Sequence, residues 1–285
     1  MMKKTICALL ALVMILSLAA CGEKKQEEQQ EPKTLIDEIQ ERGYLTLVTE
    51  PYFAPMEFID PAKEGDAKYV GMDIEIGQYI AEQLGVELKI VPLEFGAVLS
   101  SIAEGKYDIA LSGLGYTPER AEAFDFTTYY LNEGDNRFSL VVREEDYDLY
   151  NSFEDFNGKK VVAQAGSLQE TYALNQMDTS KFGEFIRVSS TTDGYMMVQE
   201  GKADAAVCAV ANADLYIEAN PGMKTLGDKM VFEVDPETLG TRGGVAKGNP
   251  EFLAFVNKCL EELRDSGKAS EWYQQYKEYA AKLGL

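Results

Sequence analysis

Short apolar runs, typical of buried strands, alternate with segments of helical periodicity from about residue 35 onward. Glycines such as Gly85 and Gly105 end the expected helices. Strands that alternate with helices in this way predict an α/β fold with parallel sheets. The expected strands are Tyr44–Thr49, Val86–Val91, Asp108–Leu111, Phe138–Val142, Lys160–Ala163, Ile186–Val188, Ala203–Cys208 and Gly243–Ala246.

The segments between these strands predict helices and turns. Asp73 is a candidate N-cap for a helix that runs to Leu84. The prolines of residues 50–58 predict a loop, because proline cannot extend a strand. The final helix, Ser270–Leu283, has three aromatic residues that we expect to pack on the first of two lobes, the one that begins at residue 35. They are Trp272, Tyr273 and Tyr276.

One stretch combines a strand end, glycines and a helix start. Ser112, Gly113 and Gly115 have little side chain, so that another group can approach the backbone. Thr117 is the expected N-cap of the next helix, and a proline occupies its first position. Arg120 follows in the first turn, beside free N–H groups, which suits it to hold a carboxylate. A turn with an ordinary surface arginine is the other interpretation.

A second helix start follows the strand at residues 160–163. Ser167 and Glu170 have the spacing of a capping box. The free N–H groups at this start, in the segment that contains Leu168 and Gln169, could bind a carboxylate together with Arg120. In parallel sheets ligands bind beyond the carboxyl ends of the strands, so the topology gathers these segments at one edge.

Composition and charge exclude several classes of function. The chain has 27 basic and 48 acidic residues, and so lacks the basic surface that nucleic-acid binding requires. It contains no His, which excludes Ser-His and Cys-His catalysis and removes the commonest metal ligand. No metal cluster, phosphate loop or haem motif is apparent, and we expect neither a metal nor a cofactor.

The amino terminus predicts export. Residues 1–20 have a basic start, an apolar core and small residues at the end, as in a signal peptide. Cys21 follows Leu-Ala-Ala, which resembles the bacterial lipoprotein box and implies a lipid on Cys21. An ordinary signal peptide with a chance Cys is the alternative. Residues 21–34 are then the lipidated end and a solvated tether. We expect the remaining Cys208 and Cys259 to be buried thiols without a disulfide.

The order of several short motifs resembles the polar amino-acid family of solute-binding proteins that serve ABC importers. The likeness covers nearly the whole chain from about residue 35, and its strength lies in the order of the motifs. The motifs are Phe53–Phe58, Gly71–Ile76, Leu84–Val86, Gly105–Ile109, Ser112–Arg120 and Phe124–Tyr130.

The resemblance implies a type II periplasmic-binding-protein fold, in which two Rossmann-like lobes, joined by two hinge crossings, close like a Venus flytrap. Lobe 1 would comprise residues 35–135 and 240–285, and lobe 2 residues 136–239. It also implies an extracytoplasmic, lipid-anchored monomer that delivers a small amino acid to a membrane permease. An enzyme resembling the dehydratases on this scaffold is a rival; it would need an acid/base pair such as Glu50 and Asp193.

The resemblance assigns roles to single residues. Arg120 would pair with the ligand carboxylate, and Phe53 and Phe95 would sandwich the ligand side chain, although ordinary core aromatics are the alternative. Ser112 and Gly113 would meet the ligand's polar end. Glu50 matches an acidic position that contacts the ligand side chain, although an exposed rim acid is an equal alternative.

Three positions depart from the family pattern. Ala209 stands where many members have an Asp that meets the ligand ammonium, and Gly115 and Leu168 stand where hydroxyl residues are usual. A buried ammonium without an acid is costly. Either Asp193 or Glu50 substitutes for the missing acid, or the ligand lacks a free α-amine.

Overall fold

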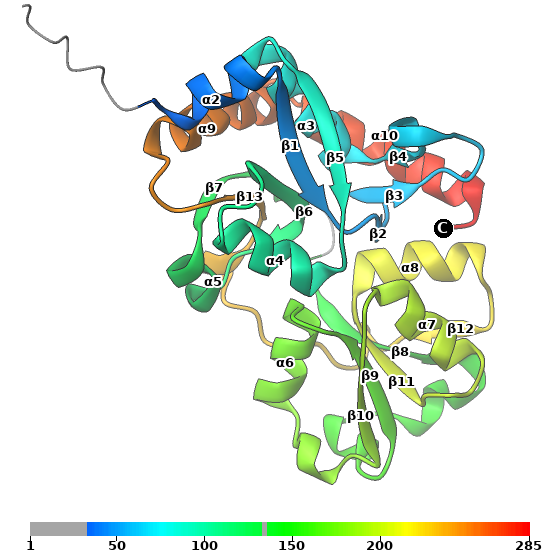
Figure 1. The fold of residues 1–285 in the computed structure, drawn as a ribbon. Helices are drawn as coiled ribbons and strands as arrows, with labels where there is room; N and C mark the ends of the chain where they lie inside the picture. The colour runs from blue at the N-terminus through cyan, green and yellow to red at the C-terminus, as the bar shows by residue number, and fades with distance from the viewer. Residues whose placement is uncertain (1–32, 133–135) are drawn as a thin grey trace, which may run out of the picture. The chain divides into compact units, whose positions relative to one another are not determined.

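Two five-stranded sheets form the framework of the protein (Figure 1). The structure is a computed structural model that describes residues 33–132 and 136–285, and residues 34–285 form one compact unit. The predicted signal peptide and Cys21 lie outside the described residues, as does nearly all of the predicted tether. No helix in the described part of the chain is long and apolar enough to cross a membrane.

The first sheet is mixed rather than purely parallel. Its order is β5 (Glu87–Pro92), β1 (Tyr44–Thr49), β6 (Ile109–Gly115), β13 (Thr241–Val245) and β7 (Asp125–Leu131). Strands β5, β1 and β6 are parallel, as the sequence predicts, but β13 runs antiparallel to both of its neighbours. This strand belongs to the first sheet, as predicted, although it comes after the whole second sheet in the chain.

The second sheet repeats this plan. Its order is β10 (Glu184–Val188), β9 (Lys160–Gln164), β11 (Ala205–Ala209), β8 (Phe138–Arg143) and β12 (Met223–Thr225). Strands β10, β9 and β11 are parallel, whereas β8 is antiparallel to β11 and β12. The chain passes from one sheet to the other after β7 and returns after β12. The predicted α/β fold of two sheet-containing lobes is therefore confirmed, and the exact lobe limits remain a prediction.

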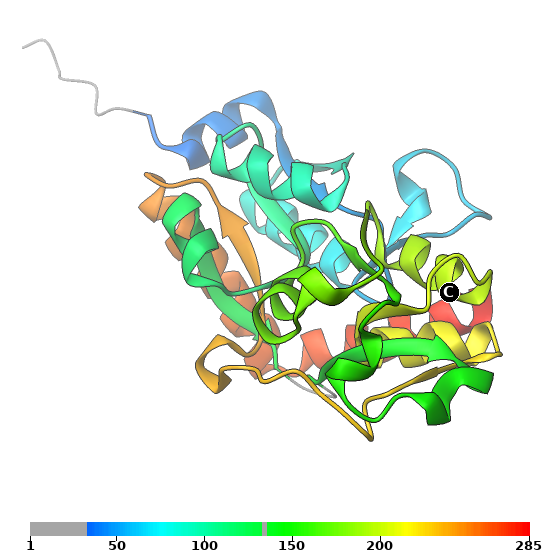
Figure 2. The same ribbon diagram turned by 90° about the horizontal axis from the view of Figure 1, so that it is seen from below.

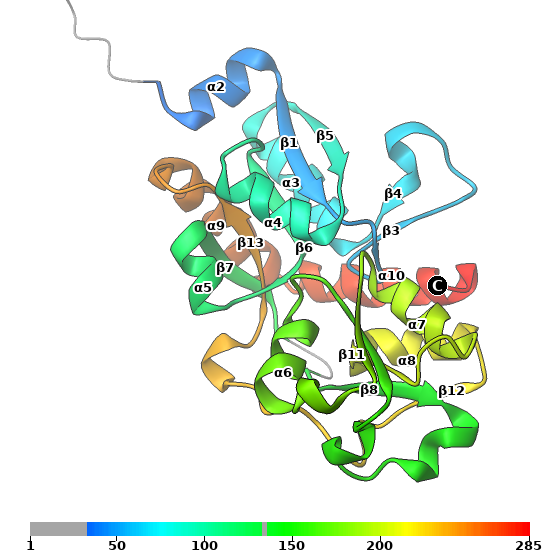
Figure 3. The ribbon, with the colours of Figure 1, turned by 60° about the horizontal axis from the view of Figure 1, so that its bottom comes forward.

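Helices cover both faces of each sheet, as the alternation of side chains along the strands requires. The helices are α2 (Leu35–Arg42), α3 (Met72–Leu84), α4 (Phe95–Ala103), α5 (Pro118–Ala123), α6 (Leu168–Gln176), α7 (Thr191–Gln199), α8 (Val210–Ala219), α9 (Pro250–Asp265) and α10 (Lys268–Leu283). In the first sheet Leu45 and Leu47 pack in one apolar cluster with residues of α2, α3 and α9, whereas Val48 packs in another with residues of α4. These helices lie around the sheet in Figure 1. In the second sheet α6 covers one face, and α7 and α8 cover the other (Figure 3). Short 3-10 helices are η1 (Gly65–Lys68), η2 (Glu144–Leu149), η3 (Phe153–Phe156), η4 (Thr179–Lys181) and η5 (Pro236–Thr238).

The predicted loop at residues 50–58 contains strands, so this prediction is wrong in part. Strands β2 (Tyr52–Phe53), β3 (Glu57–Ile59) and β4 (Tyr69–Val70) form a small antiparallel sheet. The prolines at positions 51 and 55 flank β2 and do not interrupt its pairing, which explains why the proline rule did not exclude it.

Asp73 is not an N-cap, contrary to the prediction. The N-cap of α3 is Gly71, and Asp73 is fully buried in the first turn. Its carboxylate accepts hydrogen bonds from the Gly113 N–H at 2.8 Å and from the Tyr130 hydroxyl at 2.8 Å. Asp73 therefore fixes the glycine-containing end of β6, which carries part of the site described below.

The C-terminal helix α10 contacts both lobes. Trp272 and Tyr273 pack against the core of the first sheet, as predicted. The helix also lies beside α8, and Tyr276 and Ala280 share an apolar cluster with Leu215 of that helix (Figure 2, red beside yellow). The aromatic residues of α10 thus pack on the first lobe and, beyond the prediction, join it to the second.

Candidate functional site

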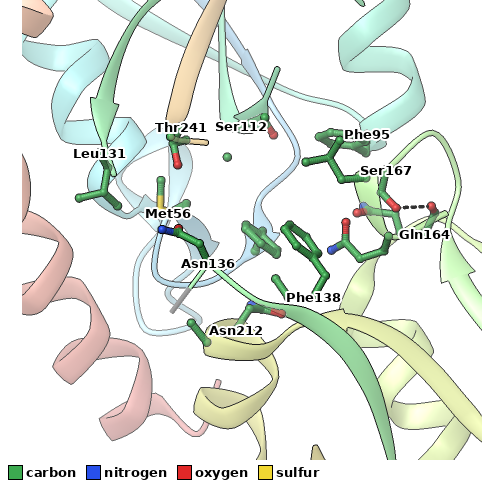
Figure 4. Close-up of a pocket in the computed structure, with 18 of the residues that line it drawn as sticks. Met56, Phe95, Ser112, Leu131, Asn136, Phe138, Gln164, Ser167, Asn212 and Thr241 are labelled. Carbon is green, nitrogen blue, oxygen red and sulfur yellow. Dashed lines mark hydrogen bonds between the residues drawn. The ribbon is translucent and has the colours of Figure 1, made fainter. Parts of the chain in front are cut away.

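A cavity of about 160 Å³ is lined by strand ends of both large sheets (Figure 4). Eleven of the twelve predicted binding residues line it. They are Glu50, Phe53, Phe95, Ser112, Gly113, Gly115, Arg120, Ser167, Leu168, Gln169 and Ala209. The topology explains this convergence, because most of these residues lie at or just after the carboxyl ends of β1, β6, β9 and β11.

Arg120 is held by main-chain groups and an aromatic ring. Thr117 caps α5 by accepting a hydrogen bond from the Arg120 N–H at 3.1 Å, as predicted. The guanidinium donates to the carbonyl oxygens of Gly115 at 2.7 Å and Gly166 at 2.9 Å. It lies over the Phe95 ring, 5.4 Å from the centroid. The second of these bonds joins the two lobes.

The charge of Arg120 has no carboxylate partner among the described residues. Burial lowers its pKa to about 10, so the guanidinium is still charged at neutral pH. A partly buried cation without a counterion favours an anionic ligand. Arg120 is thus the strongest anion-binding feature of the cavity.

Tyr172 adds a second polar group near Arg120 and was not predicted. Tyr172 and Arg120 both line the cavity. Burial raises the pKa of the Tyr172 phenol, and the charge of Arg120 partly opposes this shift. Tyr172 lies four residues after Leu168 on α6, so both side chains share one face of that helix. This spacing is the signal in the sequence that could have revealed it.

The start of α6 forms only part of the predicted capping box. Ser167 caps the helix by accepting from the Glu170 N–H at 3.1 Å. The Glu170 carboxylate, however, accepts from the N–H of Gly166 at 2.6 Å instead of that of Ser167. The N–H groups of Leu168 and Gln169 have no partner within the helix, because they lie in its first turn. They are free to donate to an anion.

Gly115 and Leu168 lie against each other across the cavity wall. A Cβ atom on Gly115 would stand 2.5 Å from Cδ1 of Leu168. Two of the three departures from the family pattern are therefore in direct contact, and a side chain at position 115 would require the end of the Leu168 side chain to move.

Phe53 lies against the β6 strand because position 113 is a glycine. Gly113 has φ +56°, and a Cβ there would be 3.0 Å from the Phe53 ring. Phe53 and Phe95 both line the cavity, where a ligand side chain could lie between them. That role remains a prediction. Phe95 has a further contact that the sequence did not indicate, namely the guanidinium above its ring.

Glu50 is a buried carboxyl group with an unused oxygen. It is 2% exposed, and its Oε1 has no hydrogen-bond partner within residues 33–132 and 136–285. Burial raises its pKa to about 8; a hydrogen bond with Gln164 opposes this shift and the charge of Asp193 adds to it. The exposed rim acid considered above is excluded, and the carboxyl group is largely protonated at neutral pH.

Glu50 belongs to a buried network of hydrogen bonds that includes Ser112 and Glu57. The Ser112 hydroxyl accepts from the Glu50 N–H at 3.0 Å and donates to Oε1 of Glu57 at 3.1 Å. Burial raises the pKa of Glu57 well above its usual value and that of Asp73 to about 6. The hydroxyl hydrogen of Ser112 is thus used within the protein, which limits Ser112 to a supporting or accepting role toward a ligand.

Asp193 does not line this cavity. It lies in α7 and lines a second cavity of about 700 Å³, together with Glu50, Tyr52 and Glu94. Its carboxylate accepts from the Ser189 hydroxyl at 3.3 Å. Glu50 forms part of both cavities, and the charge of Asp193 helps to raise its pKa.

Residues from the two crossings and from α8 complete the cavity. Figure 4 shows Phe95, Ser167 and Gln164 on one side of it and Leu131, Asn136 and Thr241 on the other. No motif in the sequence marks these crossing residues, because their position depends on how the two sheets are connected. The other lining residues that were not predicted include Met56, Phe138, Asn212 and Tyr273.

Substitution of Glu50 by glutamine should stabilise the ligand-free protein at alkaline pH. The folded protein holds the Glu50 proton up to about pH 8, whereas an unfolded carboxyl loses it near pH 4.5. The wild type therefore loses stability as pH rises from 4.5 to 8, and Glu50→Gln does not. We expect a gain on the order of a few kcal/mol at pH 8 and none from this source at pH 4.5. Urea unfolding of both proteins at pH 4.5 and at pH 8 measures this gain in unfolding free energy.

Glu261→Gln, at an exposed position of α9, is the control for the change in net charge. Equal unfolding free energies for Glu50→Gln and the wild type at pH 8 would contradict the proposed protonation.

Comparison with known proteins agrees with a two-lobed solute-binding protein. The family model for bacterial extracellular solute-binding proteins, family 3, matches residues 45–279. The chain therefore belongs to this family, whose members act outside the cytoplasm.

Two curated relatives come from Bacillus subtilis. The chain is 25% identical over 278 residues to the arginine-binding extracellular protein ArtP, covering 94% of this chain and 95% of that protein. It is 28% identical over 276 residues to the L-cystine-binding protein TcyA, covering 95% and 96%. Among solved structures, an amino acid ABC transporter substrate-binding protein from Streptococcus pneumoniae bound to L-arginine matches with a TM-score of 0.76 and 28% identity. That match covers 88% of this chain and 98% of the other.

Proposed function

We propose that the protein captures a small amino acid or a related carboxylate outside the cell and delivers it to the permease of an ABC importer. The observation that carries this proposal is Arg120, a charged guanidinium at a small cavity between two lobes, with no carboxylate partner in the described part of the chain. The ligand carboxylate would bind Arg120 and the free N–H groups of α6. The ligand's carbon chain would lie between Phe53 and Phe95.

Binding would stabilise the closed form of the two lobes. Hydrogen bonds already join the two lobes near the cavity: Arg120 to the Gly166 carbonyl, Thr192 to the Tyr52 carbonyl at 3.3 Å, and Asn212 to the Ala54 carbonyl at 2.8 Å. A ligand that contacts both walls would add to these contacts only when the lobes are closed. Closure would thus report occupancy to the permease.

Glu50 would meet the far end of the ligand. Relatives are named for binding arginine or cystine, both of which carry polar groups distant from one carboxylate. A cationic or hydrogen-bond-donating group there would pair with the unused oxygen of Glu50. A cation would displace the proton from this carboxyl group, because ionised Glu50 would then have a counterion.

The membrane attachment is part of the same proposal. Lipid on Cys21 would hold a monomeric protein at the membrane surface near its permease, and more than one acyl chain makes such attachment stable. Expression of the full chain with radiolabelled palmitate tests this. Label and membrane-bound protein are expected for the wild type and not for Cys21→Ser; equal membrane recovery of both would contradict the lipid anchor.

Catalysis on the same scaffold is the rival function. One matched structure is an ancestral amino acid-binding protein described as a precursor of cyclohexadienyl dehydratase. Of the proposed acid/base pair, only Glu50 lines the cavity with Arg120, whereas Asp193 lines the other. Binding without turnover is therefore the function that we propose.

Mass spectrometry of whatever is released on denaturing the purified protein is the direct test. We expect a small carboxylate, recovered unchanged after incubation with fresh protein. Recovery of a converted product would favour the enzyme, and a ligand without any anionic group would contradict the role of Arg120.

A further inference from the structure

An apolar contact joins the two lobes outside the ligand cavity. Leu215 of α8 lies in one cluster with Phe58 and Val70 of the small sheet and with Tyr276 and Ala280 of α10 (Figure 2). Leu215 is 3% exposed and Ala280 is 0% exposed, so the contact excludes water. These five residues lie apart from the described residues that line either cavity. The contact therefore acts on binding only through the arrangement of the lobes.

Helix α10 is anchored to the first lobe. Its aromatic side chains pack against the core of the first sheet. The Tyr276 hydroxyl also donates to the carboxylate of Glu75 in α3. The Tyr279 hydroxyl donates to the carboxylate of Asp60, which follows β3. Helix α8, in contrast, packs on the second sheet through Ala213. The contact between α8 and α10 is therefore a contact between the two lobes.

The same helix, α8, forms part of the cavity wall. Ala211 and Asn212 line the cavity, and the Asn212 amide donates to the Ala54 carbonyl of the first lobe at 2.8 Å. Leu215 lies three residues after Asn212 and so on the same face of the helix. When the second lobe moves away to admit a ligand, the helix moves as one unit. Leu215 then leaves the apolar cluster as the bond to Ala54 breaks.

Apolar burial, rather than hydrogen bonding, gives this contact its effect on closure. Interlobe hydrogen bonds such as that from Asn212 are replaced by bonds to water when the lobes part, so their net contribution is small. The apolar surfaces of Leu215 and Ala280 have no such replacement, and opening exposes them to water. The contact therefore favours the closed form whether or not a ligand is present.

We infer that the contact of Leu215 with Tyr276 and Ala280 is a latch, which raises the closed fraction of the ligand-free protein and thereby sets the affinity of a cavity that it does not touch. The link to affinity rests on the proposed function, because it assumes that the ligand binds the closed form. For such a ligand the apparent affinity falls in proportion to the fraction of closed molecules. Residues of the latch then determine affinity together with the residues of the cavity.

Small-angle X-ray scattering of the ligand-free protein tests the latch directly. We expect a larger radius of gyration for Leu215→Ala than for the wild type, because the truncation removes an apolar contact that only the closed form makes. Leu215→Val should give a smaller increase. Leu226→Ala is the matched control: Leu226 is 0% exposed in the core of the second sheet, so the same substitution should lower stability and leave the radius unchanged. Equal radii for Leu215→Ala and the wild type would overturn the inference.

Titration calorimetry with L-arginine, the ligand in the matched Streptococcus pneumoniae structure, gives the second measurement. We expect Leu215→Ala to weaken binding at least about fivefold and Leu226→Ala to leave the Kd unchanged. An unchanged Kd in a folded Leu215→Ala variant would overturn the link between the latch and affinity. A wild type that does not bind L-arginine would count against arginine as the ligand, and the scattering result would then decide the latch by itself.

Discussion

Replacing Arg120 with alanine is expected to weaken binding of the ligand carboxylate by roughly 10- to 150-fold, since a hydrogen bond to a charged group contributes about 1.5–3 kcal/mol. Arg120 lines the cavity as a charged donor that has no counterion among the residues that the structure describes. The variant also loses the bond to Gly166 that joins the lobes, so the closed form loses stability even without ligand. Titration calorimetry with the compound identified by mass spectrometry measures the change in Kd.

Two controls separate the guanidinium from its charge. Arg120→Lys keeps the charge but loses the planar fork that reaches two acceptors at once, and we expect an intermediate affinity. Lys258→Ala removes one positive charge from an exposed position of α9 and should bind as the wild type does. Unaltered affinity in a folded Arg120→Ala variant would show that the carboxylate binds elsewhere.

Local chemistry and topology explain why most of the site could be predicted. The Thr117 cap depends on residues three positions apart, so the sequence alone was sufficient to locate Arg120 at a helix start. Parallel strands then bring distant loops to the same edge whatever the details of packing. Eleven predicted residues meet at one cavity for this reason.

Predictions failed where long-range partners override local preference. Asp73 has the sequence context of an N-cap, yet its carboxylate binds Gly113 and Tyr130, which are 40 and 57 residues away. Its burial beneath β6 could be known only once α3 had been placed on the sheet. The crossing residues Asn136 and Thr241 are a similar case, because they reach the cavity only through the connection between the lobes.

The contact between Gly115 and Leu168 shows what a position-by-position comparison misses. Each residue by itself is an unexplained departure from a pattern. In the structure the leucine side chain occupies the space that a Cβ at position 115 would need. The two departures are therefore one change in the shape and polarity of the wall beside Arg120, and they have to be interpreted together.

Both the fold and the site depend on position 71 being a glycine, which has no Cβ atom. It has φ +135° and ψ 170°, a backbone region that is almost restricted to glycine. A Cβ there would lie 2.2 Å from the Met56 carbonyl oxygen and 2.8 Å from Cα of Glu57, both main-chain atoms. The same carbonyl accepts from the Asp73 N–H at 2.9 Å. The start of α3 is thus packed directly on the segment that carries two cavity residues.

Gly71→Ala is therefore expected to destabilise the protein by about 2–6 kcal/mol, the sum of backbone strain and overpacking. It should also weaken ligand binding, because Met56 and Glu57 must move to admit the methyl group. Gly85→Ala is the matched control: it also has a positive φ, +74°, but no atom lies within 4 Å of the added Cβ. Gly85→Ala should lower the free energy of unfolding by about 1–2 kcal/mol and leave the affinity for the ligand unchanged. Urea unfolding with a common m-value compares the two variants. Equal losses of unfolding free energy would show that the Met56 carbonyl can move aside at no cost.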